Sequence, residues 1–140
     1  MSATPLAGFA RNQVPQTALR RFLALDSAVT TANGLAYAAF SAPLGRLLGV
    51  GQGLLLELGV LLLAYGAAVG WLASRRQPPV LPVKLVIETN YAWAALSLVS
   101  LALWFDPTTA GLLWIPVQAA TVAGFAVLQQ LALRSGSATQ

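Results

Sequence analysis

The chain has 140 residues, of which 57% are hydrophobic and only 9% are charged. Soluble domains carry about a quarter charged residues, so this composition excludes a protein whose whole surface faces water. The net charge of +4 comes from basic residues at the ends of apolar segments, which favours a membrane protein over a nucleic-acid binder. Cysteine and histidine are absent, so thiolate or imidazole metal sites and histidine-ligated haem are excluded, and no cofactor is expected.

Four apolar segments follow one another, each close to the ~20 residues that a helix needs to cross the hydrocarbon core. Because lipid offers no hydrogen-bond partners to the backbone, such segments must be helical. The sequence therefore predicts an all-α protein, a four-helix transmembrane bundle with spans at about 20–42, 52–74, 81–105 and 108–133. A polar cytoplasmic tail over 1–19 precedes this domain (20–134), and a short tail over 135–140 follows it.

The first span is interrupted by polar residues in the segment LALDSAVTTANGLAY, residues 23–37. Four of them are spaced by four, three and four positions, so on a helix they share one face. They are Asp26, Thr30, Asn33 and Tyr37. This stripe is expected to face other helices or a cavity. For Asp26 two interpretations stay open: an ion pair with an arginine at the inner boundary, or a site for a ligand or proton.

The first span is expected to end near the stretch SAPLGRLLGVGQG, because Pro43 and its glycines break helices. In the second span, Glu57 is interpreted as structural, since a carboxylate is favoured near a helix N-terminus. Gly59, Gly66 and Gly70 lie on the other side, and small residues let another helix approach closely. This face is expected to pack against a helix, and it is the candidate surface for a homo-oligomer or a partner in a membrane complex.

The third span divides its polar residues between two faces. Lys84, Glu88 and Tyr91 share one face, while Asn90 and Trp93 share another. A salt bridge between Glu88 and Lys84, four positions apart, is favoured over a ligand-binding role for Glu88. Asn90 is expected to face other helices, and Trp93, well inside the span, to fill the core or to line a pocket.

The fourth span follows the tight turn DPTT, in which Asp106 or Thr108 is a candidate N-cap. Gln118 and Gln129 share one face of this span, and Trp114 near its outer end is interpreted as part of an aromatic belt. Helical rise places four polar residues at a similar depth, in the cytoplasmic third of the membrane. They are Asp26, Glu88, Asn90 and Gln129.

Basic residues mark the cytoplasmic side of a membrane protein. Seven of them flank one side of the predicted spans, and Arg46 stands alone on the other. The seven are Arg11, Arg20, Arg21, Arg75, Arg76, Lys84 and Arg134. Together with the short connections, this asymmetry predicts an up-down-up-down bundle with both termini in the cytoplasm, as a multi-pass protein of the inner (plasma) membrane.

Three patterns give the chain a resemblance to a known group of proteins. They are Asp26 early in the first span, Asn90 to Trp93 in the third, and Thr108 to Gly111 before the fourth. In these features the chain resembles small uncharacterised four-span integral membrane proteins of bacteria. The resemblance covers most of residues 20–134; it implies the fold and leaves the activity open.

No catalytic constellation is recognisable, since there is no nucleophile elbow, phosphate loop or histidine, and an enzyme is not favoured. The leading hypothesis is a polar bundle interior that binds a small amphipathic or cationic ligand, with transport as an extension. The candidate ligand-binding residues are Asp26, Thr30, Asn33, Tyr37, Glu88, Asn90, Trp93 and Gln118. The alternative is a non-catalytic accessory or scaffold subunit of a larger membrane complex. A cavity bounded by polar residues favours the first role, and complete pairing of those residues favours the second.

Overall fold

The structure, a computed structural model, describes residues 5–103 and 106–138. In this part of the chain there are five helices and no strand: α1 (Pro5–Ala39), α2 (Ser41–Leu48), α3 (Gln52–Ser74), α4 (Val80–Leu103) and α5 (Thr109–Ala138). The all-α prediction is confirmed. Three helices, α3, α4 and α5, are long and apolar enough to cross a membrane. The predicted first span is not among them, because the polar stripe of α1 lowers its hydropathy.

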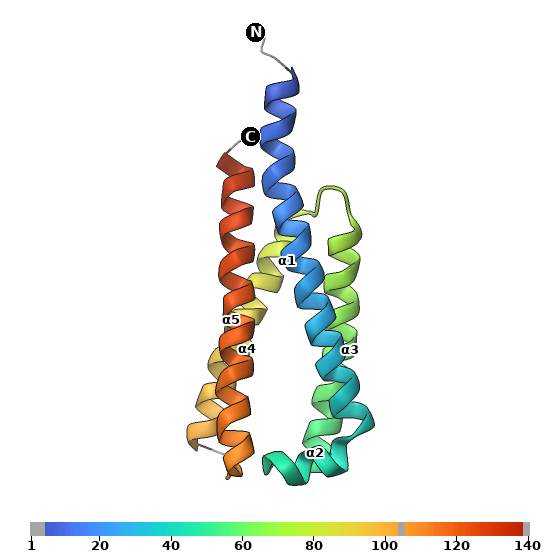
Figure 1. Ribbon diagram of the computed structural model, residues 1–140, viewed down its shortest axis with the longest axis vertical. Coiled ribbons are helices and arrows are strands. Elements are labelled where there is room, and N and C mark those ends of the chain that lie inside the picture. The colour runs from blue at the N-terminus through green and yellow to red at the C-terminus, as the bar shows by residue number, and fades with distance from the viewer. Residues whose placement is uncertain (1–4, 104–105, 139–140) are drawn as a thin grey trace.

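The four long helices alternate in direction along the chain, and both ends of the chain lie at the same end of the molecule (Figure 1). The loop between α3 and α4 also lies at this end, while α2 crosses the opposite one. The predicted second span coincides with α3. The first helix is longer than predicted, since it already begins at Pro5 and takes in most of the predicted tail. The predicted third span ends at residue 105, and the tails include residues 1–4 and 139–140; these positions lie outside the described residues.

The helix α1 ends at Ala39, close to the predicted end of the first span, and the connection after it contains the short helix α2. Pro43 is the third residue of this helix, within the first turn, where a missing backbone N–H costs no hydrogen bond. The helix ends at Gly49, whose φ of 75° lies in the left-handed region and whose N–H donates to the Gly45 carbonyl. Of the residues expected to break the helix, Gly49 ends α2, whereas Pro43 lies inside it.

The end of α2 is joined to the turn before α5. The backbone N–H of Thr108 donates to the Leu48 carbonyl at 3.2 Å, and the Thr108 hydroxyl donates to the Leu47 carbonyl. The same hydroxyl oxygen accepts from the Gly111 N–H at 3.2 Å, so Thr108 is the N-cap of α5, as predicted. These contacts close the end of the molecule opposite the termini.

Helices α1 and α3 pack through glycines at backbone distance. A Cβ atom on Gly59 would lie 2.6 Å from the Ala38 nitrogen, and one on Gly34 would lie 2.9 Å from the Gly59 carbonyl oxygen. Gly66 and Gly70 face the side chains of Thr31 and Ser27 in the same way. The small-residue face of the second span, a candidate surface for an external partner, is thus covered by α1 of the same chain.

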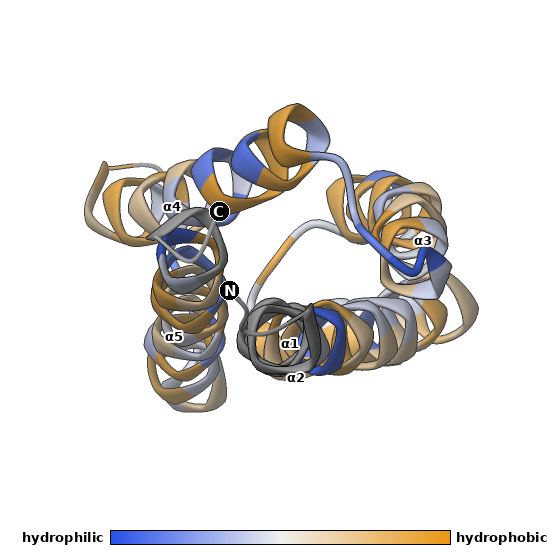
Figure 2. Ribbon diagram, turned by 90° about the horizontal axis from the view of Figure 1, so that it is seen from above, coloured by the Kyte–Doolittle hydropathy of each residue, from blue (hydrophilic) through white to orange (hydrophobic). Residues whose placement is uncertain are grey.

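The four long helices form two pairs, α1 with α3 and α4 with α5. The two pairs contact each other through α1 and α5. Figures 1 and 2 show α3 beside α1 and α4 beside α5, with α3 and α4 joined near the termini and apart at the other end. A buried apolar cluster gathers side chains from all four helices, including Leu23, Val69, Val86 and Ala126. This core holds the four helices together on one side of the polar residues described below.

We expect Gly59→Ala to destabilise the protein by about 1–3 kcal/mol, because the added methyl group meets backbone atoms that cannot move independently. Unfolding of the purified protein in detergent, by heat or denaturant, measures this loss. Gly124→Ala on α5 is the matched control, since nothing lies within 4 Å of a Cβ at that position. Equal stability of the two variants would contradict the close α1–α3 packing.

Candidate functional site

The carboxylate of Asp26 joins three helices. Asp26 is completely buried, and its Oδ2 accepts hydrogen bonds at 2.8 Å from the Asn90 amide of α4 and at 2.8 Å from the Gln129 amide of α5. Its Oδ1 accepts at 3.1 Å from the hydroxyl of Thr30, one turn further along α1. A buried carboxylate without partners would cost several kcal/mol, so these contacts fix how the helices rotate against each other.

Helix α3 enters the same cluster through Tyr65. The Tyr65 hydroxyl lies 2.9 Å from Asn90 Oδ1 and 3.1 Å from the Val86 carbonyl oxygen, and its one hydrogen serves one acceptor at a time. Asn90 Nδ2 also donates to Gln129 Oε1 at 3.2 Å. In each side-chain hydrogen bond at Asp26, the carboxylate is the acceptor. We call Asp26, Thr30, Tyr65, Asn90 and Gln129 the Asp26 cluster.

The cluster differs from the ion pair that was one of the two interpretations of Asp26. Its partners are neutral side chains, and the nearby Arg20 instead donates from Nε to the Ala73 carbonyl at 3.1 Å. The predicted common depth of Asp26, Asn90 and Gln129 is correct, since the three are in direct contact. In the described residues no group of three histidine, cysteine or acidic residues is placed to hold a metal ion.

A cavity of about 120 Å³ lies on the α2 side of this cluster. Its polar lining comes mainly from the predicted stripe of α1 and from α5, and its aromatic lining from α1, α4 and α5. The polar residues include Thr30, Asn33, Tyr37 and Gln118, and the aromatic ones are Tyr37, Trp93, Trp114 and Phe125. We call this space the aromatic cavity. The polar stripe of α1 thus faces inward, as predicted.

Two hydrogen bonds hold the walls of the aromatic cavity. The indole N–H of Trp114 donates to the Tyr37 hydroxyl at 2.7 Å, and that of Trp93 donates to Gln118 Oε1 at 2.9 Å. The side-chain amide of Asn33 is half-buried and has no hydrogen-bond partner among the described residues. Asn33 therefore offers both a donor and an acceptor to a molecule in the cavity.

A second cavity of about 110 Å³ adjoins the first, between α3 and α4. Both cavities are lined by Thr30, Leu62, Trp93 and Val122. The second also includes Asn90 and Leu61, and because Leu61 is 57% exposed, this cavity reaches the outer surface of the molecule. Asp26 lines neither cavity; its link to both is the side chain of Thr30.

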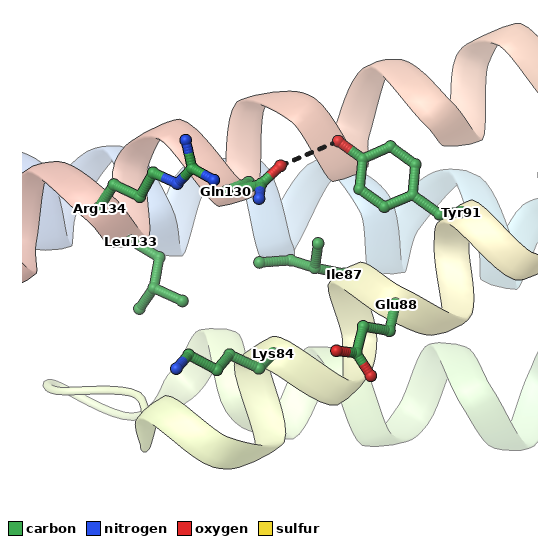
Figure 3. Close-up of a pocket in the computed structure, with 7 residues that line it drawn as sticks. All are labelled: Lys84, Ile87, Glu88, Tyr91, Gln130, Leu133 and Arg134. Atoms are coloured by element: carbon green, nitrogen blue, oxygen red, sulfur yellow. Dashed lines mark hydrogen bonds between the residues drawn. The ribbon is translucent and has the colours of Figure 1, made fainter.

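Glu88 lies apart from the other predicted site residues. It is exposed and lines a groove between α4 and α5, together with Lys84 and Tyr91 (Figure 3). The predicted salt bridge is wrong, because the Lys84 ammonium points away from the Glu88 carboxylate (Figure 3). The two faces predicted for the third span are nevertheless both found: one lines this groove, the other the cavities.

Three residues that matter here were not predicted as site residues. Trp114 lines the aromatic cavity and is not a simple belt residue. Gln129 was assigned the correct depth but no role, and its face on α5 was the signal that could have included it. Tyr65 stands alone in the apolar middle of α3, so periodicity gave no indication of its direction.

No protein-family model matches this chain, and neither a curated protein nor a solved structure matches it. Function must therefore be argued from the geometry of these residues.

We expect Asp26→Leu to lower the free energy of unfolding in detergent, because it removes the acceptor of the Gln129 amide and of the Thr30 hydroxyl and one of the two acceptors of the Asn90 amide, at about 1–3 kcal/mol for each group left unpaired. Asp26→Asn keeps one acceptor oxygen and should lose less. Glu88→Leu is the control at an exposed acid of α4, with an expected change within about 0.5 kcal/mol. Equal effects of the two leucine substitutions would show that the Asp26 cluster does not stabilise the fold.

Proposed function

We propose that the chain is a multi-pass protein of the bacterial inner membrane, spanned by α1, α3, α4 and α5, with both termini in the cytoplasm. Exposed leucines occur on each of these helices, as a lipid-facing surface requires. Arg75 and Arg76 lie at the end that carries the termini, and Arg46 lies in α2 at the other. The Arg75 guanidinium stacks 5.1 Å from the centre of the exposed Trp71 ring, a pairing suited to the membrane interface.

This orientation is tested with single cysteines, since the chain has none of its own. A membrane-impermeant maleimide applied to intact cells should label Gln52→Cys, at the start of α3, and not Gln77→Cys, in the α3–α4 loop. Both positions are exposed, and both should react after the cells are opened. Labelling of Gln77→Cys in intact cells would show that the orientation is the opposite of the one proposed.

We further propose that the aromatic cavity binds a small, neutral, amphipathic molecule. The observation that carries this proposal is the unpartnered Asn33 amide in a cavity whose other polar walls are already hydrogen-bonded. An amide partly withdrawn from water and without partners costs free energy, and a ligand with a hydroxyl or carbonyl group would satisfy it. Trp93, Trp114 and Phe125 supply apolar surface for the rest of that ligand.

The dimensions favour a ligand about the size of one ring. An apolar protein cavity of about 150 Å³ binds benzene, and the aromatic cavity has about 120 Å³. With the adjoining cavity, the space approaches the ~300 Å³ at which ligand pockets generally begin. A longer molecule could therefore continue past Trp93 into the second cavity.

A neutral ligand is favoured over a cationic one because Asp26 is inaccessible. Its oxygens face the Thr30 hydroxyl and two amides, and Asp26 lines neither cavity. The route into the site favours a lipid-soluble compound. The second cavity reaches the surface at Leu61, between helices that face the bilayer in the proposed orientation.

Phenol and benzene distinguish the polar contact from simple cavity filling, since they share a ring and differ by one hydroxyl group. We expect phenol to raise the unfolding temperature of the wild type more than benzene does. Asn33→Leu should reduce phenol affinity about 2- to 12-fold, the value of one hydrogen bond of about 0.5–1.5 kcal/mol. Gln130→Leu makes the same change outside the cavity and should leave the preference intact. An unchanged preference in Asn33→Leu would remove Asn33 from the site.

The second candidate function is a non-catalytic accessory subunit of a larger membrane complex. One observation favours it: the Asp26 cluster pairs its buried polar groups between four helices, as a purely structural element would. A wild-type protein that responds to neither phenol nor benzene would support this role over ligand binding.

A further inference from the structure

The groove that contains Glu88 is a separate feature from the two cavities. It has a volume of about 740 Å³ and lies between α4 and α5, toward the end of the molecule that carries the termini. Across it, the Tyr91 hydroxyl donates to Gln130 Oε1 at 3.1 Å. Ile87 and Leu133 supply an apolar floor (Figure 3). The groove is therefore open, with an apolar floor and, at one end, the hydrogen bond between Tyr91 and Gln130.

Two cationic groups flank the groove, one from each helix. Lys84 comes from α4 and Arg134 from α5. The Lys84 side chain extends away from Tyr91, whereas the Arg134 side chain runs back toward Gln130, and the two charged groups lie on opposite sides of the groove (Figure 3). The Glu88 carboxylate neutralises neither of them: the Lys84 ammonium points away from it, and the Arg134 guanidinium lies across the groove. The groove thus presents a pair of positive charges beside an apolar floor.

We propose that this groove binds an anionic phospholipid, with Lys84 and Arg134 holding the phosphate and one acyl chain lying over Ile87 and Leu133. A guanidinium can bind phosphate oxygens through two parallel hydrogen bonds, and an ammonium adds a compact point charge. Anionic lipids are abundant at the cytoplasmic surface of membranes. The proposal rests on the proposed membrane location and not on the ligand of the aromatic cavity.

Glu88 provides a control in which binding should change in the opposite direction to that expected for the basic residues. Its carboxylate lies in the same groove, one helical turn deeper than Lys84, and opposes a bound anion. Removing its charge should therefore strengthen phosphatidylglycerol binding, although the variant loses a polar group. A groove that merely collects detergent or lipid tails would not respond in this direction.

Native mass spectrometry of the protein released from detergent micelles measures the binding of single lipids. Phosphatidylglycerol should bind more tightly than phosphatidylcholine of the same chain length. The double variant Lys84→Gln/Arg134→Gln should lose about 30-fold in affinity, the loss expected for two basic groups at an anionic membrane surface. The matched control Arg75→Gln/Arg76→Gln removes two charges from the exposed loop at the same end and should change affinity less than threefold. Glu88→Gln should raise it.

Three outcomes would overturn the proposal. Equal losses in the two double variants would show that only the overall charge attracts the lipid. Equal binding of phosphatidylcholine would show that the phosphate charge is not recognised. Displacement of phosphatidylglycerol by an equal concentration of glycerol 1-phosphate would assign the groove to a soluble phosphate compound. None of these outcomes affects the phenol test, because Asn33 and the aromatic cavity lie elsewhere.

Discussion

The burial of Asp26 is the constraint on which the rest of this structure depends. A carboxylate in an apolar interior must find hydrogen-bond donors, and in Asp26 these come from α1, α4 and α5. Between purely apolar helices in lipid, sliding by a turn changes little, because lipid tails are as apolar as leucine. Asp26 removes this freedom. Only one rotation and one depth of α4 and α5 bring Asn90 and Gln129 to the same oxygen atom.

The two cavities follow from how the polar stripe of α1 is divided. Its inner half is closed, since Asp26 and Thr30 are both engaged in the cluster. Its outer half is open, because Asn33 faces a space and Tyr37 is held by Trp114 rather than by another helix backbone. Thr30 stands at the boundary and takes part in both. A single sequence pattern thus supplies the hydrogen bonds that fix the helices and, one turn further, the polar wall of a candidate binding site.

Helical geometry explains which features could be predicted from the sequence. The periodicity of Asp26, Thr30, Asn33 and Tyr37 predicted one inward face, and the rise per residue placed Asn90 and Gln129 at the depth of Asp26. Both are properties of a rigid helix, and both agree with the contacts. The extent of α3 and the cap at Thr108 were predictable for the same reason, since they depend on local sequence alone.

The features that were missed depend on side-chain direction and on neighbouring helices. Spacing permits a Lys84–Glu88 pair, but exposed side chains are free to point apart. A tryptophan near a helix end fits an aromatic belt as well as a cavity, and only the position of α1 assigns Trp114 to the second. Pro43 breaks a helix in its interior but not in its first turn, so α2 could not be recognised without knowing where it begins.

The glycine contacts between α1 and α3 give the molecule a mechanical character. Where backbones touch, as at Gly34 and Gly59, no side chain remains that could change rotamer to accommodate movement. Between α3 and α4, by contrast, contact is confined largely to one end and to the hydroxyl of Tyr65. Packing is therefore close between α1 and α3 and sparse between α3 and α4. In the membrane location proposed above, a deformation imposed by the bilayer, such as thinning or lateral pressure, would be expected to separate α3 and α4, which also form the wall of the second cavity.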